Sequence, residues 1–119
     1  MTQKIALLSL SIAATAALAG ERFVGAAGAY ATAAGNTFGV TTTEAKVGDL
    51  VTTDVLGTSV VTAGGAIAKN AYVQVGSDGK AVALTTGVAV AQALQAAAAD
   101  GDRIEVLLIQ NAPTPAPAG

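Results

Sequence analysis

Residues 86–110 read TGVAVAQALQAAAADGDRIEVLLIQ and contain the clearest strand in the chain. Its last part, 103–109, is an apolar run that follows a Gly-Asp turn, which is typical of a strand. Residues 39–55, GVTTTEAKVGDLVTTDV, repeat the same order of parts: Gly-Val, a connector containing alanine, Gly-Asp and a strand. The two stretches predict two similar β units, as a duplication would produce.

Short strands recur along the chain at roughly ten-residue spacing, with turn signals between them. The best hairpin signal is Asp78-Gly79, which suits a turn of positive φ between two alternating runs. Gly57-Thr58 is expected to turn the chain so that 59–62 pairs back. Residues 92–99 have the strongest helix propensity, and because they span barely two turns we expect a short helix or a loop. The fold class predicted is all-β: a small, compact β-barrel or sandwich of short antiparallel strands with at most one short helix.

The length of 119 residues fits one domain with two short ends. We divide the chain into an N-terminal strand or arm at 1–19, a β domain at 20–110 and a flexible Pro/Ala tail at 111–119. The tail carries prolines at 113, 115 and 117, which favour a polyproline-like conformation.

The composition excludes most catalytic and metal chemistry. The chain has no cysteine and no histidine, so disulfides and Cys/His zinc sites are impossible, and no imidazole is present to activate a serine or threonine. Asp100 and Asp102 flank a glycine, as does Asp49, and such carboxylates typically accept backbone hydrogen bonds in turns. We therefore predict no catalytic, cofactor or metal residues, and a protein that is not an enzyme.

Charge is low, with a formal net charge of −2 and six scattered basic residues. Nucleic-acid binding needs clustered basic charge to displace counterions, so no nucleic-acid partner is predicted. High apolar content with little charge indicates instead that part of the apolar surface is covered by copies of the chain or by a partner.

The N-terminus, MTQKIALLSLSIAATAALA, has two possible interpretations. A lysine, an apolar run and Ala-Leu-Ala before Gly20 imitate a secretory signal with its cleavage site. The alternation of leucines and Ile12 with Ser9 and Ser11 is instead the period of a half-buried strand. The segment is too short and too rich in Ser, Thr and Ala to predict a membrane span. We expect one or two β segments here.

Several short motifs occur together in a fixed order. They are Ala45-Lys46-Val47-Gly48-Asp49, Ala63-Gly64-Gly65-Ala66-Ile67, Gly76-Ser77-Asp78-Gly79-Lys80, Gly87-Val88-Ala89, the alanines at 96–99, Gly101-Asp102, and Ile104-Glu105-Val106-Leu107-Leu108. In this order and spacing the chain resembles the capsid cement, or head decoration, proteins of tailed bacteriophages. The resemblance covers about 7–109. The chain departs from the family's pattern at the apolar N-terminus and the Pro/Ala tail, so the resemblance implies no function for these two ends.

The resemblance implies a compact β domain on the outer surface of the virion. Such proteins bind the outside of an assembled icosahedral head, often as trimers at three-fold and quasi-three-fold positions. The expected partners are the major capsid protein, whose neighbouring subunits it would bridge, and further copies in a homotrimer. No cofactor, nucleic acid or membrane is implied.

From the alternating pattern we add one hypothesis of our own, that the N-terminal strand adds to a sheet edge of the capsid protein or of a neighbouring copy. The residues predicted for this contact are Leu8, Ser9, Leu10, Ser11 and Ile12.

Two other classes remain open at this stage. One is a secreted or surface-exposed bacterial β protein, an adhesive or interaction module for which 1–19 would be a signal peptide. The other is a small hydrolase or ligand-binding module, for which the sequence offers no set of residues.

Overall fold

The computed structural model describes residues 5–109, and the predicted tail at 111–119 lies outside the described residues. The described chain is an antiparallel β structure with one short 3₁₀ helix, η1, so the predicted fold class is confirmed. Its elements are β1 (Ala6–Ala13), β2 (Phe23–Val24), β3 (Gly39–Thr41), β4 (Leu50–Thr62), β5 (Tyr72–Val75), η1 (Ser77–Gly79), β6 (Ala81–Ala83), β7 (Ala91–Ala93) and β8 (Arg103–Leu108).

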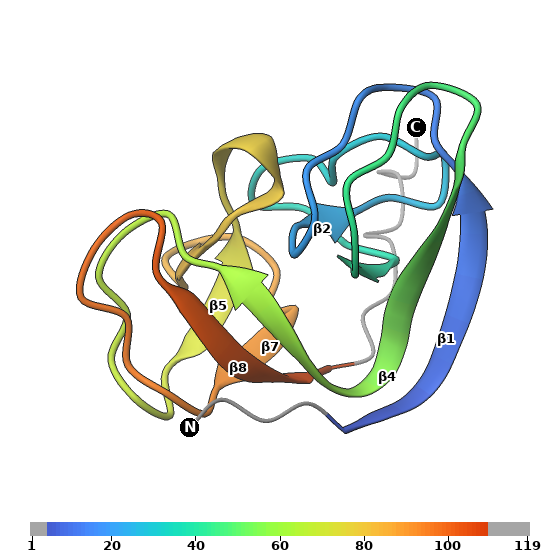
Figure 1. The fold of residues 1–119 in the computed structure, drawn as a ribbon. Coiled ribbons are helices and arrows are strands. Elements are labelled where there is room, and N and C mark those ends of the chain that lie inside the picture. The colour runs from blue at the N-terminus through green and yellow to red at the C-terminus, as the bar shows by residue number, and fades with distance from the viewer. Residues whose placement is uncertain (1–4, 110–119) are drawn as a thin grey trace, which may run out of the picture.

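One long strand, β4, runs through both halves of the molecule (Figure 1). Its first half lies between β1 and β3, and its second half pairs with β8. The strand order is β2-β3-β4-β8-β7-β5-β6, with β1 also paired to β4. The predicted reversal at Gly57-Thr58 is wrong: Gly57 has a φ of +96°, but the chain continues in the same strand. Register shifts in the facing part of β1 accommodate the irregularity.

The two halves are equivalent units, as the repeated sequence predicts, but the two Gly-Val motifs do not lie at equivalent positions. Unit 1 comprises β1, β2, β3 and the first half of β4, and unit 2 comprises the second half of β4 with β5 to β8. The pairs that join β1 to β4 recur between β4 and β8, so that Ile12–Val51 corresponds to Val61–Ile104. The pairing of β2 with β3 likewise recurs between β5 and β7.

Each unit buries a matching set of apolar side chains on one face. In unit 1 these residues form a small cluster, Ala14, Leu18, Val24, Ala45 and Val51, with Ile12 packed against it. Their equivalents in unit 2, Ala63, Ile67, Val73, Ala97, Ile104 and Val61, belong to the large core. Isolated bridges repeat as well, between Leu18 and Ala45 in unit 1 and between Ile67 and Ala97 in unit 2.

The two Gly-Asp turns have the same geometry. Gly48 and Gly101 have φ values of +92° and +95°, which glycine adopts without a steric penalty. Asp49 Oδ2 accepts the Lys46 N–H, and Asp102 Oδ2 accepts the N–H groups of Ala98 and Ala99. The structural role predicted for these two aspartates is confirmed.

Residues 92–99 form no helix. The chain passes from β7 through a bend to the bridge at Ala97, and Asp102 fixes the backbone that follows. The pairing of β7 with β5 and β8, and the bridge at Ala97, therefore override the helix propensity of alanine. Of the two expectations, a short helix or a loop, the loop is confirmed. At the predicted hairpin, Asp78 and Gly79 both have positive φ and join β5 to β6.

Candidate contact surface

The N-terminal strand β1 lies at an open edge of the sheet. It pairs antiparallel with β4, and within residues 5–109 no strand pairs with its other side. Seven of its eight residues are exposed, and Ile12 is half-buried. A strand in this position presents unpaired backbone N–H and C=O groups, which can take up another strand.

The structure separates the five residues predicted for partner contact. Leu8 and Leu10 stand on one face of β1 and are 46% and 42% exposed. Ser9 points to the other face, where its hydroxyl is bonded to Asp54. Ser11 is exposed, and Ile12 packs against the small cluster of unit 1. The side chains open to a partner are therefore mainly Leu8, Leu10 and Ser11.

A buried carboxylate fastens β1 to the domain. Asp54, in the middle of β4, is only 1% exposed. Its Oδ1 accepts a hydrogen bond from Ser9 Oγ at 2.7 Å, and its Oδ2 accepts one from Ser59 Oγ at 2.8 Å. Hydrogen bonds to a charged acceptor contribute about 1.5–3 kcal/mol each. The alternation of β4 gives no signal for this cluster, because it places Asp54 among residues that are expected to face solvent.

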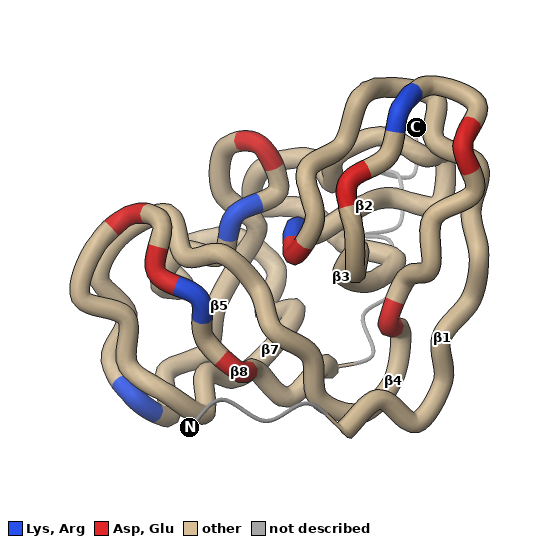
Figure 2. The backbone as a smooth tube through the Cα atoms, in the orientation of Figure 1, with Lys and Arg blue, Asp and Glu red and all other residues tan. Residues whose placement is uncertain are grey.

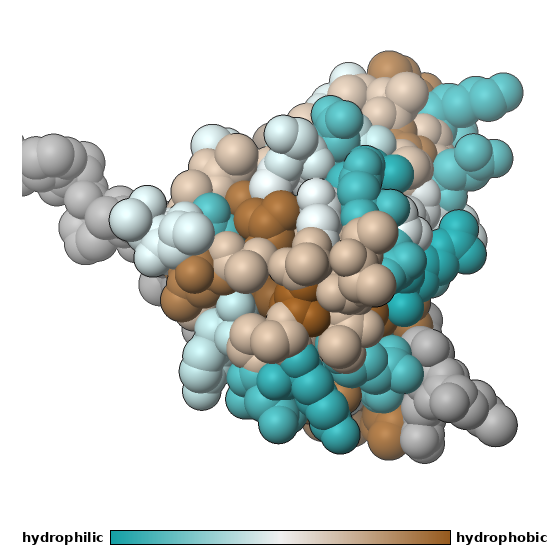
Figure 3. All heavy atoms as spheres, turned by 90° about the vertical axis from the view of Figure 1, so that its left-hand side faces the viewer, coloured by the Kyte–Doolittle hydropathy of each residue, from teal (hydrophilic) through white to brown (hydrophobic). Residues whose placement is uncertain are grey.

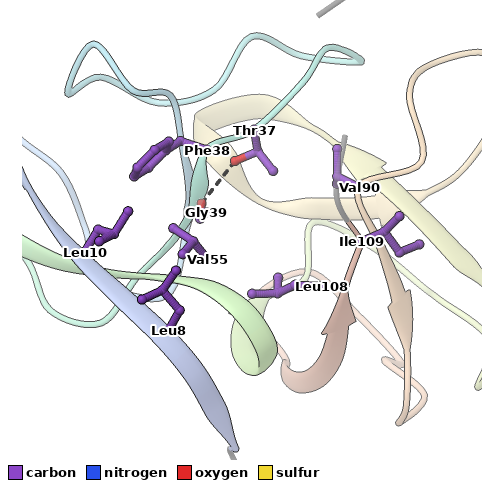
Figure 4. A pocket seen from close by; sticks show the side chains of 9 residues that line it. All are labelled: Leu8, Leu10, Thr37, Phe38, Gly39, Val55, Val90, Leu108 and Ile109. Atoms are coloured by element: carbon purple, nitrogen blue, oxygen red, sulfur yellow. Dashed lines mark hydrogen bonds between the residues drawn. The ribbon is translucent and has the colours of Figure 1, made fainter. Parts of the chain in front are cut away.

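Leu8 and Leu10 form one wall of an apolar groove between the two units (Figure 4). Val55 and Phe38 lie beside them, and Val90, Leu108 and Ile109 stand opposite. The groove has a volume of about 310 Å³. Its lining carries no charged side chain, so it fits an apolar occupant.

Sequence reasoning did not find the other residues of this groove. They come from four segments that are far apart in the chain, and only the topology brings them together. Phe38 precedes the first Gly-Val motif, and Val90 and Leu108 lie in the second repeated stretch, so the repeats mark the right segments but not the groove.

The charged residues of the described chain are dispersed (Figure 2). Lys80 pairs with Asp100 at 2.9 Å and Arg103 with Glu21 at 3.0 Å, both at the surface. Within residues 5–109 no three acidic side chains gather where they would hold a metal ion. No helix in that range has the length and apolar character to cross a membrane.

Small and apolar residues also dominate one end of unit 2. Figure 3 shows an apolar centre there, with hydrophilic residues gathered along its margins. An apolar centre inside a polar rim is the usual anatomy of a protein–protein contact.

These features, a domain with an open strand, an uncharged groove and dispersed charge, agree with one comparison in particular. A family model described as phage cement protein matches residues 2–108. The chain belongs to the phage cement protein family. It is therefore a structural protein of a phage head, associated with the capsid of the virion.

The fold of this cement protein is similar to a solved structure from another phage. The N base of head fiber gp8.5 in bacteriophage phi29 matches with a TM-score of 0.71 and 21% sequence identity. The match covers 86% of this chain and 93% of that one. At this identity the likeness establishes a common fold. The comparison with curated proteins gave no match.

Proposed function

We propose that this cement protein decorates the outside of an icosahedral phage head and stabilises it by bridging neighbouring major capsid subunits. The proposal includes self-association into homotrimers on the shell. The role is structural, requires no catalysis and needs no cofactor. Membership of the phage cement family supports it, as does an uncharged surface that packs on a partner at low cost in side-chain entropy.

The observation that carries the proposed contact is the open edge of β1. We infer that the backbone of 8–12 adds to a sheet edge of the major capsid protein. Main-chain hydrogen bonds would supply affinity, and the exposed side chains that alternate along the strand would supply specificity. Repetition over many sites on one shell makes such a contact effective even when each copy binds weakly.

The alternative of a secreted bacterial protein is less well supported. Cleavage after Ala19 would remove Ile12, Ala14 and Leu18 from the small cluster of unit 1. Ala14 and Leu18 are 2% and 3% exposed, so the cleaved domain would lose part of its core.

The direct test is co-sedimentation of the full chain with expanded heads that lack it. Saturable binding that also raises the temperature at which the heads break is the expected result. Absence of binding at concentrations well above that of the capsid sites would overturn the cement role. As a surface control, Val47→Asp changes an exposed residue, 69% accessible, in the turn bonded to the chain just after β1 and outside residues 8–12, and should bind normally.

Hydrogen exchange on the same samples tests the edge of β1 separately. On binding, backbone amides within 6–13 should exchange more slowly, because a free strand edge becomes paired. Binding without protection of these amides would retain the cement role and reject this contact.

A further inference from the structure

On one face of unit 1, a single row of side chains runs across the strands. Phe23 lies opposite Val40, Val40 opposite Asp54, and Asp54 opposite Ser9. Residues directly opposite in antiparallel strands share a face. We call this row the outer face of unit 1. The opposite side, with Ile12, Leu10, Leu8, Val24 and Val51, is its inner face.

Unit 2 has the equivalent row in the same register. Tyr72 lies opposite Gln92, Gln92 opposite Leu107, and Leu107 opposite Thr58. Leu84 extends the row, since its N–H bonds to the Tyr72 carbonyl. This row is the outer face of unit 2, and the side with Val61, Val73 and Ile104 is its inner face.

Within the chain, the outer face of unit 1 packs on the inner face of unit 2. Phe23 and Val40 are both 0% exposed and lie in the same core cluster as Val61, Val73 and Ile104. The small cluster on the inner face of unit 1 is separate from that core. The molecule thus contains one complete outer-on-inner contact between equivalent units.

The outer face of unit 2 is open, and the inner face of unit 1 is open only at Leu8 and Leu10, because the small cluster already buries Val24 and Val51. On the outer face of unit 2, Tyr72 is 50%, Leu107 42% and Leu84 37% exposed. On the inner face of unit 1, Leu8 and Leu10 line the apolar groove of Figure 4. Because the units are equivalent, the exposed residues of these faces are two halves of the same kind of contact, and within residues 5–109 they do not pack on each other.

We propose that the outer face of unit 2 in one copy packs on the inner face of unit 1 in a second copy. Between two chains, this contact repeats the packing of an outer face on an inner face that already joins the two units within one chain. It is head-to-tail, so it generates a closed ring or a longer array. It would supply the residues for the self-association in the proposed function, and it is testable on the free chain.

The internal contact identifies which side chains should meet. Asp54 and Ser59 touch across the internal junction, at 2.8 Å between Oδ2 and Oγ. The pairing of β4 with β8 makes Leu107 the equivalent of Asp54, and Leu10 the equivalent of Ser59. A polar pair inside the chain thus corresponds to an apolar pair, Leu107 with Leu10, between copies. Two leucines that cover one another stabilise association by removing apolar surface from water.

Single cysteines test this pair, because the natural chain has none. Leu107→Cys and Leu10→Cys copies are mixed and oxidised at about 1 mM, where even weak association is populated. A 10–107 disulfide should form in excess over 10–10 and 107–107 disulfides. Val47→Cys, mixed with Leu107→Cys, is the matched control and should cross-link only at the background rate.

Charged variants give a second readout by sedimentation velocity. Leu107→Lys and Leu10→Lys should each weaken self-association at least about tenfold, because each buries an unpaired charge. A mixture of the two should form one heterodimer and nothing larger, since each variant keeps one intact face. Both residues are 42% exposed in the free chain, so circular dichroism should show an unchanged fold.

Three results would overturn the proposal. A chain that remains monomeric and yields no 10–107 disulfide lacks the contact. Dominant 107–107 disulfides would mean a symmetric contact instead. An intramolecular disulfide between Leu10→Cys and Ala112→Cys, in a monomer, would make the chain's own C-terminal segment the occupant of the groove. If the Leu107→Lys variant binds heads normally, the capsid role stands even where one of these three results rules out the contact between copies.

Discussion

At the scale of single residues, Asp54 is the side chain on which the attachment of β1 most depends. Replacement by alanine removes the acceptor for Ser9 and Ser59 and leaves the buried Ser59 hydroxyl without this partner. We expect Asp54→Ala to lower the free energy of unfolding by about 3 kcal/mol, the lower end of what two such hydrogen bonds contribute. Urea unfolding followed by circular dichroism measures this. Ser11→Ala, an exposed position on the same strand, is the control, and equal midpoints for the two variants would contradict the assignment.

Gly39 is a second residue whose identity is set by close approach. A Cβ at this position would lie 2.3 Å from the Asp54 carbonyl oxygen and 2.8 Å from Thr53 Cγ2. The nearer neighbour is backbone in a paired strand and cannot move away cheaply. Gly39→Ala is expected to cost about 3 kcal/mol of stability, as severe overpacking does. Gly65→Ala, where nothing lies within 4 Å, should be neutral or slightly stabilising in the same thermal or urea measurement.

At the scale of elements, local signals predicted the turns better than the strand partners. Asp78-Gly79 depends on residues that adopt positive φ, and the two Gly-Asp turns depend on glycine conformation and on aspartate bonds to nearby backbone. These features can be read from neighbouring residues. The course of β4 through Gly57 cannot be read in this way, because a glycine of positive φ can lie in a bend within a strand as well as in a reversal of the chain. The alanines after β7 have helix propensity, yet long-range pairing decides their conformation.

β1 is an element whose removal tests contact and fold together. The large core contains no residue of β1, so a chain lacking 2–12 should remain folded. It would lose the Ser9–Asp54 bond and the packing of Ile12, and we expect its unfolding free energy to fall by about 2–4 kcal/mol. Capsid co-sedimentation should be abolished. A folded deletion variant that binds heads as the full chain does would exclude β1 from the contact.

At the scale of the whole molecule, the duplication explains what the sequence could and could not predict. The repeated Gly-Asp motif marks equivalent turns, whereas Gly39-Val40 is equivalent to Ala91-Gln92 rather than to Gly87-Val88, and neither motif indicates which face of each unit is covered. Phe23 and Tyr72 are equivalent aromatic residues, and one is 0% and the other 50% exposed. The difference arises because unit 2 covers unit 1, which is a property of their packing. The alternating pattern predicted Leu8 and Leu10 as contact residues, whereas the groove that they line depends on how the two units pack.

The shared strand and shared core predict that both units unfold together. β4 belongs to both units, and Phe23 and Val40 of unit 1 are buried in the core of unit 2. Neither unit therefore has a complete core alone, which favours one cooperative transition. Tyr30 reports on unit 1, because it packs against the small cluster and its hydroxyl accepts the Ala19 N–H at 2.8 Å. In a Tyr72→Phe chain, Tyr30 is the only tyrosine and tryptophan is absent. Its fluorescence midpoint in urea should coincide with the circular dichroism midpoint. An earlier fluorescence transition would mean that unit 1 opens by itself and that the internal contact is weaker than its burial implies.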